Sequence, residues 1–187
     1  MIISAFPACG KTYLFENQDK LTFKCLGEEK KFTFRDSDSS HYAKHENWEK
    51  EYVNDLKKEL GTVDFIFISQ HENVLAELEA QHIPFVAIAP DNSEWLSDEE
   101  RRLIKQQWFG RFILRNNNHI KDFDKWLICL KENYDNWTSQ EQLSKHNPVA
   151  LFLLKENEYI SNIIADLYWK KEHYDYYTKI VKDENFL

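Results

Sequence analysis

The chain has 187 residues, of which 15% are aromatic and only 4 are glycine, and its formal net charge is −8 at pH 7. This length suffices for one domain with a sizeable core, and the acidic balance argues against non-specific binding to nucleic acid or anionic membranes. Three cysteines without a CxxC spacing predict reduced thiols, and no apolar run approaches the roughly 18 residues of a membrane-spanning helix. We therefore expect a single cytoplasmic domain over residues 1–187.

The amino-terminal stretch joins a short apolar run to a turn that ends in Gly10, Lys11 and Thr12. Residues 1–4 predict a buried strand, and residues 13–15 can open a helix. A strand, a turn of this length and a helix are typical of a loop that cradles phosphate with backbone N–H groups. Gly10 suits this role because a Cβ there would obstruct the approach of the backbone to the nucleotide. The residues expected to bind the nucleotide are Pro7, Ala8, Cys9, Gly10, Lys11, Thr12 and Tyr13.

Two side chains of the Ala5–Thr12 loop would act on the nucleotide directly. Lys11 would reach the β- and γ-phosphates, and the Thr12 hydroxyl would bind Mg²⁺. Ala5 replaces the glycine with which such loops usually begin, and the backbone tolerates this change if position 5 needs no positive φ. The alternative is a chance sequence in an ordinary turn. The apolar strand directly before the loop favours the phosphate-binding interpretation.

Two short runs, 21–25 and 32–35, follow the first helix, and residues 27–31 between them can turn a hairpin. We expect the second run to be the second core strand and the first to be an additional strand. Asp36 and Asp38 come just after that core strand, where open α/β sheets bind ligands, and alternation would aim both side chains the same way. The alternative role for these carboxylates is to cap the following helix, and both roles can hold together.

The middle of the chain alternates helices with apolar strands, a pattern that indicates a parallel sheet with right-handed crossovers. The expected helices span 47–60 and 72–81, and the expected strands span 63–68 and 85–89. Ser69 follows the first of these strands, at a position where nucleotide-binding proteins often have an acidic residue. Mg²⁺ therefore needs a carboxylate from elsewhere, and Asp36 or Asp38 could supply it.

A cationic helix follows the strand over 85–89. Ser97 and Glu100 predict a capping box at its start. We expect Arg101 and Arg102 to lie on a solvated face of this helix, paired with Glu99 and Glu100.

Two later arginines of this helix have a different setting. Arg111 and Arg115 are spaced i, i+4, so they share one face, and they lie among aromatic residues. Arginines beside strand ends can clamp phosphate and stabilise charge on a transferring phosphoryl group. We therefore expect an arginine-bearing lid over residues 94–118.

The last third of the chain completes the alternation. The expected elements are a helix over 119–137, a fifth strand over 149–154, a closing helix over 158–171 and a short last helix in the tail. His41 and His45 have a metal-binding spacing on a helix, but no second His or Cys pair completes a zinc site.

Taken together, these motifs resemble a known family. The Ala5–Thr12 loop, the Asp36-Ser37-Asp38 sequence and the arginine-bearing helix resemble the nucleoside-monophosphate-kinase-like branch of P-loop proteins, which includes adenylate, shikimate and gluconate kinases. The chain also resembles small nucleotide-kinase-like proteins of phages and Gram-positive bacteria, and the likeness covers roughly residues 1–165. The Asp-x-Asp pattern is most similar to shikimate and gluconate kinases. By that resemblance Asp36 helps to hold Mg²⁺ and Asp38 meets the acceptor hydroxyl.

We therefore expect a three-layer α/β/α P-loop NTPase fold with five mostly parallel strands and a helical lid. The expected activity is ATP-dependent phosphoryl transfer to a small acceptor, in particular a nucleotide. One alternative is a nucleotide-binding module with little or no turnover, which Ser69 favours. Another is a polynucleotide 5′-kinase, which the net charge of −8 disfavours. The expected catalytic residues are Lys11, Asp38, Arg111 and Arg115, and the expected Mg²⁺ ligands are Thr12 and Asp36.

Overall fold

A parallel five-stranded sheet forms the centre of the protein, in a computed structural model that describes residues 1–37, 39, 42, 46–116 and 123–173, with residues 115 and 116 described in their backbone only. The strand order is β4-β5-β1-β6-β7, and each neighbouring pair is parallel. Consecutive apolar residues make these strands, as expected for a sheet that is covered on both faces. The bounds are β1 Ile2–Ala5, β4 Phe34–Asp36, β5 Phe65–Ile68, β6 Phe85–Pro90 and β7 Ala150–Leu154.

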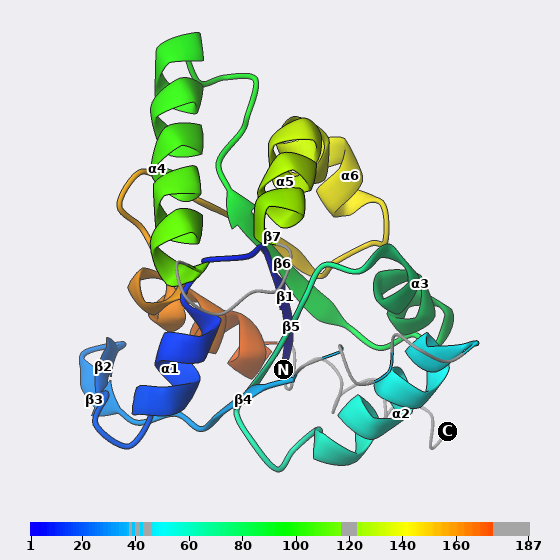
Figure 1. Cartoon of the computed structure of the whole chain (residues 1–187). Helices are drawn as coiled ribbons and strands as arrows, with labels where there is room; N and C mark the ends of the chain where they lie inside the picture. The colour runs from blue at the N-terminus through cyan, green and yellow to red at the C-terminus, as the bar shows by residue number, and fades with distance from the viewer. Residues whose placement is uncertain (38, 40–41, 43–45, 117–122, 174–187) are drawn as a thin grey trace.

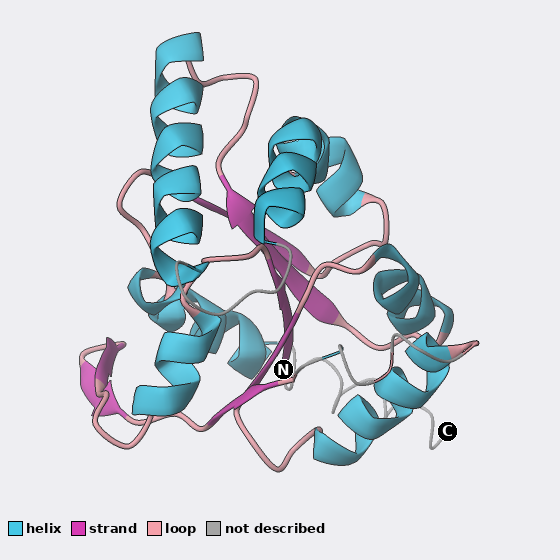
Figure 2. Ribbon diagram, viewed as in Figure 1, coloured by secondary structure: helices cyan, strands magenta, loops and turns pink. Residues whose placement is uncertain are grey.

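Helices cover both faces of this sheet, and Figure 1 shows α1 on one side and α2 and α3 on the other. Their bounds are α1 Lys11–Asn17, α2 Trp48–Glu59, α3 Glu72–Ala80, α4 Asp98–Asn116, α5 Phe123–Trp137 and α6 Gln140–Ser144, and a further helix covers 164–173. Figure 2 shows the strands between these two sets of helices. None of the helices among the described residues has the length and apolar character to cross a membrane.

Two apolar clusters, one on each face, hold these layers together. Ile2, Ile66 and Ile68 pack with side chains of α2 and α3 on one face. Ile3 and Phe67 pack on the other face with side chains of α1, α4, α5 and the helix over 164–173. Alternate residues of β1 therefore serve opposite cores, as the two-residue period of a strand requires. This arrangement is compatible with the expected three-layer α/β/α fold.

The hairpin after α1 differs from the prediction. Its strands are β2 Phe23–Cys25 and β3 Glu28–Lys30, which pair antiparallel with each other. The run over 32–35 leads into β4 of the main sheet, so the predicted second core strand is confirmed. Leu26 and Gly27 form the turn, and both have positive φ, 53° and 88°. A two-residue turn with left-handed backbone at both positions matches the twist of a hairpin, so the reversal comes earlier than a turn over 27–31 would place it.

The end of the chain also departs from the predicted elements. The short helix α6 was not predicted, and the closing helix begins near residue 164, after a 3₁₀ turn at Ile160–Asn162. The tail beyond 173, residues 119–122 of the predicted helix and the pair His41 and His45 lie outside the described residues.

The predicted capping box at the start of α4 is present. The Ser97 backbone N–H and hydroxyl both donate to the Glu100 carboxylate, at 2.8 and 2.6 Å, and the Glu100 N–H donates to the Ser97 hydroxyl at 3.3 Å. Arg101 pairs with Asp98, three positions before it, because side chains one position apart do not face each other on a helix. Arg102 pairs with Glu99, as expected.

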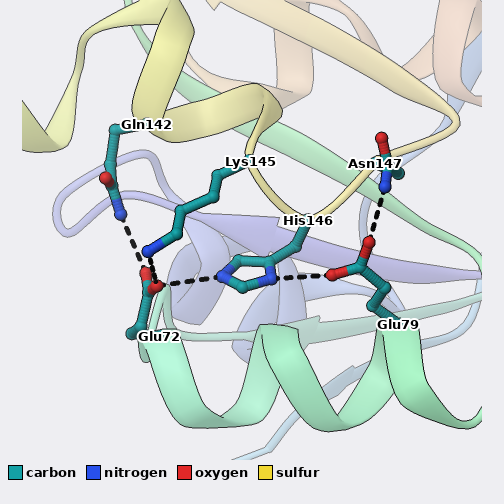
Figure 3. A network of polar contacts seen from close by, with 6 residues as sticks. All are labelled: Glu72, Glu79, Gln142, Lys145, His146 and Asn147. Atoms are coloured by element: carbon teal, nitrogen blue, oxygen red, sulfur yellow. Dashed lines mark hydrogen bonds and ion pairs between the residues drawn. The ribbon is translucent and has the colours of Figure 1, made fainter.

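A polar network ties α3 to the segment that leads from α6 into β7 (Figure 3). The buried His146 ring lies between two carboxylates of α3, with Nδ1 3.0 Å from Glu79 and Nε2 3.1 Å from Glu72. The contact with Glu72 has the distance of an ion pair without the alignment of a hydrogen bond. Lys145 also pairs with Glu72, and Asn147 donates to Glu79 at 2.5 Å.

The burial of α1 allows a first prediction. Leu14 is 1% exposed and belongs to the core under α1, whereas Leu114 of α4 is 77% exposed. Leu14→Ala should lower the free energy of unfolding by about 2–5 kcal/mol, because it leaves a cavity in the core. The matched change Leu114→Ala should stay within about 0.5 kcal/mol of the wild type. Urea unfolding of both variants measures this, and equal effects would contradict the assignment of α1 to the core.

The network of Figure 3 predicts a dependence of stability on pH. Lys145 and His146 lower the pKa of the Glu72 carboxyl below its usual range. A group with a lowered pKa stabilises the fold above its unfolded-state pKa, about 4.3 for Glu, and loses this effect as the pH falls through the folded-state value. Glu72→Gln should therefore lower the urea midpoint at pH 7, and the difference from wild type should shrink below about pH 4.

The exposed residue Glu156 provides the control for this measurement. Glu156→Gln should leave the urea midpoint close to the wild-type value across the same pH range. A Glu72→Gln effect that is independent of pH would show that packing, and not charge, explains the contribution of Glu72.

Candidate functional site

The Ala5–Thr12 loop leaves β1 at the carboxyl edge of the sheet, and its backbone takes two left-handed positions. The Phe6 N–H donates to Ile88 of the neighbouring strand at 2.9 Å, which fixes the start of the loop. Ala8 has a φ of 63° and Gly10 a φ of 97°, and α1 begins directly after Gly10. Left-handed positions in a loop let successive backbone N–H groups form a concave anion-binding surface. The segment therefore has a backbone suited to phosphate.

The missing first glycine of the loop is explained by this geometry. Ala5 belongs to β1, is fully buried and does not have a positive φ. A Cβ at position 5 therefore costs nothing in backbone conformation. Ala8 is different, because its positive φ is unfavourable for a residue with a Cβ.

The Lys11 side chain folds back over the loop from the first position of α1. Its ammonium group donates to the Ala5 carbonyl at 2.5 Å and lies 3.4 Å from the Phe6 carbonyl. These contacts keep the charge beside the loop backbone, where a bound phosphate would lie.

The structure brings Thr12 and Asp36 together, although 24 positions separate them in the chain. The Thr12 hydroxyl donates to the Asp36 carboxylate at 2.8 Å. Thr12 lies in the first turn of α1, and Asp36 is the last residue of β4. A hydroxyl and a carboxylate fit Mg²⁺ that binds together with a nucleotide, because this ion usually takes one or two carboxylates and completes its shell with phosphates and water. No group of three or more His, Cys, Asp or Glu side chains suited to a metal exists among the described residues.

The segment after β7, at Tyr159 and Ile160, packs against the Ala5–Thr12 loop. The Ile160 N–H donates to the Cys9 carbonyl at 3.0 Å. Tyr159 lies so close to Gly10 that a Cβ added there would be 3.4 Å from the ring carbon Cδ1. The positive φ of Gly10 therefore favours glycine, whereas the tyrosine ring would meet an added Cβ at an ordinary van der Waals distance.

Helix α4 contacts the same loop through an aromatic and an arginine. The Trp108 indole N–H donates to the Pro7 carbonyl at 2.7 Å. The Arg111 guanidinium lies between two rings, 4.6 Å from that of Trp108 and 4.0 Å from that of Tyr159. It also donates to the Glu158 carbonyl at 2.7 Å. The predicted arginine thus lies next to residues that contact the loop, and its orientation is fixed by two aromatic faces.

Of the remaining predicted residues, the structure describes some and leaves others out. Cys9 is buried and Tyr13 is 57% exposed at the start of α1. Asp38 and the side chain of Arg115 lie outside the part of the chain that the structure describes. Just after β5, the Ser69 hydroxyl lies 3.2 Å from that of Ser39. Two hydroxyl groups therefore occupy the position at which nucleotide-binding proteins often have an acidic residue.

Sequence reasoning did not identify Trp108 and Tyr159 as neighbours of the loop. Trp108 lies one helical turn before Arg111 in α4, so an aromatic residue on the arginine face was the available signal. Tyr159 had no comparable signal, because its position depends on the path of the chain after β7.

Comparisons with protein-family models, with curated proteins and with solved structures gave no significant match to this chain. The case for a function therefore comes from the geometry of the Ala5–Thr12 loop and its neighbours.

Proposed function

We propose that the protein transfers a phosphoryl group from Mg²⁺-bound ATP to a small acceptor, with a nucleotide as the favoured acceptor. The observation that carries this proposal is the hydrogen bond of 2.8 Å between Thr12 and Asp36. It joins the Thr12 hydroxyl, which is expected to bind Mg²⁺, to Asp36. In this proposal Asp36 takes the place of the acidic Mg²⁺ ligand that is absent at Ser69. A chance Gly-Lys-Thr sequence would not require an acidic partner at this position.

In this proposal the loop and Lys11 hold the triphosphate. Backbone N–H groups of the loop and the ammonium group of Lys11 would neutralise the β- and γ-phosphates, so the ammonium exchanges its carbonyl partners for phosphate oxygens. Mg²⁺, when bound at Thr12 and Asp36, would neutralise charge that develops on the transferred group. Such a reaction depends mainly on positioning and electrostatic stabilisation.

Arg111 and Asp38 have separate roles in the proposal. Arg111 would stabilise charge on the phosphoryl group, and its stacking between Trp108 and Tyr159 limits the side-chain entropy that it loses on binding. Asp38 would orient or deprotonate the acceptor hydroxyl, a role carried over from the resemblance to shikimate and gluconate kinases. Arg115, one helical turn after Arg111, would support the same charge.

A second candidate is a nucleotide-binding module with little or no turnover. Two observations favour it. Ser39 and Ser69 pair where an acidic residue is usual, and Arg111 already donates to the Glu158 carbonyl. The affinity for ATP with and without Mg²⁺, together with a screen for phosphorylated products, separates the candidates. Tight binding without ADP release in the presence of any acceptor would favour the module.

The first prediction from this proposal concerns Lys11. Lys11→Ala should reduce ATP turnover on the order of 10³-fold, because the charge on the β- and γ-phosphates loses its fixed counter-charge. Lys20→Ala, an exposed lysine beyond the end of α1, is the control and should leave turnover unchanged. ADP release from the purified variants measures both effects. Turnover by Lys11→Ala at the wild-type rate would rule out the proposal.

A second prediction concerns the metal. Asp36→Asn keeps an acceptor for the Thr12 hydroxyl but removes the negative charge, so the variant should fold normally and bind Mg²⁺ weakly. The factor by which Mg²⁺ tightens ATP binding should fall on the order of 10- to 100-fold. Asp19→Asn, at an exposed position, should keep the wild-type factor. Calorimetric titrations with ATP in the presence of Mg²⁺ or EDTA give this factor, and an unchanged value for Asp36→Asn would remove Asp36 from the metal site.

A further inference from the structure

A cavity of about 460 Å³ opens beside the Ala5–Thr12 loop, between α3 on one side and α5 and α6 on the other. Phe6 and Pro7 of the loop form part of its wall, so the cavity adjoins the place where phosphate would bind. Its volume lies within the range of small-molecule sites. A cavity of similar volume, about 470 Å³, lies at the opposite edge of the sheet near Met1 and Lys171, and no residue of the loop lines it.

The wall that α5 gives to the first cavity is apolar and aromatic. Trp126, Cys129 and Trp137 of α5 line it from one side. Their spacing, i, i+3 and i+11, places them on one side of the helix, next to the stripe by which Leu130 and Tyr134 enter the core, and Trp137 also packs against that core. The apolar surface of α5 is therefore wider than the stripe that enters the core, and one edge of it lines the cavity. Indole rings provide flat surfaces on which planar ligands can stack.

Uncharged amides lie among these apolar groups. The Gln70 amide donates to the Ile88 carbonyl at 3.2 Å, and the Gln142 amide donates to the Glu72 carboxylate at 2.8 Å. Both contacts use the amide nitrogen and fix the side chain, which leaves each carbonyl oxygen as the acceptor for a ligand N–H group. Ser69 adds a hydroxyl group to the lining.

The charged groups around the cavity indicate whether it suits an anionic ligand group or an uncharged one. No lysine or arginine is present among the described residues that line it, and burial lowers the pKa of His71, which also lines it. The Glu72 carboxylate is paired with Lys145 and lies against His146. A carboxylate or phosphate group would therefore lose its hydration here without finding a cation, which is costly. An uncharged planar group with hydrogen-bonding edges meets no such cost.

We propose that this cavity holds the base of a nucleoside or nucleotide acceptor, with the reacting end of the acceptor directed toward the Ala5–Thr12 loop. This inference rests on the proposed phosphoryl transfer and specifies its acceptor. It excludes sugar acids, whose carboxylate would require a cationic partner in the cavity. The stacking surface would come from Trp126 and Trp137, and the hydrogen-bonding groups from Gln70 and Gln142.

Binding of nucleosides without ATP tests this assignment separately from catalysis. Adenosine, guanosine, cytidine and thymidine, with gluconate and shikimate as the sugar acids, are titrated calorimetrically into the full-length protein. At least one nucleoside should bind and neither sugar acid should. Trp126→Ala should weaken nucleoside binding on the order of tenfold, because stacking of one base is worth about 1–3 kcal/mol. Trp169→Ala, which removes an equally exposed indole outside the cavity, should leave the dissociation constant unchanged.

Cys129 reports where the nucleoside binds. It lines the cavity and is partly exposed, whereas Cys9 and Cys25 are buried. A nucleoside at ten times its dissociation constant should slow alkylation of Cys129 by iodoacetamide about tenfold, in proportion to the vacant fraction. Nucleoside binding without protection of Cys129, or protection by a sugar acid, would overturn the assignment, as would the absence of nucleoside binding.

These outcomes are distinct from failure of the proposed function. If no nucleoside binds but Lys11→Ala abolishes ATP turnover, phosphoryl transfer stands and the assignment of the cavity is wrong. If nucleosides protect Cys129 but the protein does not bind ATP, the cavity is a nucleoside site and the kinase proposal is wrong.

Discussion

The hydrogen bond between Thr12 and Asp36 is the interaction on which the account of the site depends. It joins the first turn of α1, where the Ala5–Thr12 loop ends, to the end of β4, which is far from it in the chain. Although β5 separates β1 from β4 in the sheet, α1 packs against β4 and so brings Thr12 to Asp36. This packing therefore builds the pair, and the buried packing of α1 through Leu14 keeps it in place.

The loop itself is held by groups that are remote from it in sequence. Ile160 bonds to Cys9, Trp108 bonds to Pro7, and Tyr159 packs against Gly10. Each of these contacts uses a main-chain group or the glycine of the loop, and the buried side chains of Phe6 and Cys9 anchor the loop in the core. Such positioning suits a site that acts through fixed N–H groups and a few charges. It also places Arg111 close to the loop through the two rings that enclose it.

Much of the sheet could be predicted because its strands are continuous apolar runs and its helices have clear periodicity. Residues 65–68 and 85–90 are buried on both faces, so their sequence carries a direct signal. The hairpin was placed wrongly because Leu26 takes a left-handed conformation that is unusual for its residue type. The position of Asp36 and Asp38 after a strand predicted an acidic partner for Thr12, and the resemblance to shikimate and gluconate kinases selected Asp36. The cavity could not be predicted, because Trp126 and Trp137 gave the same apolar signal as core residues and only the packing of α5 against its neighbours leaves part of its apolar surface open.

The central claim is that the backbone of the Ala5–Thr12 loop binds phosphate, and amide chemical shifts test it most directly. In the ¹⁵N-labelled protein, ATP and inorganic tripolyphosphate should both shift the amide signals of residues 8–13. The same perturbations for ATP and tripolyphosphate would identify the phosphates as the bound groups. Amide signals of residues 8–13 that stay in place when Mg²⁺ and ATP are added would contradict the account.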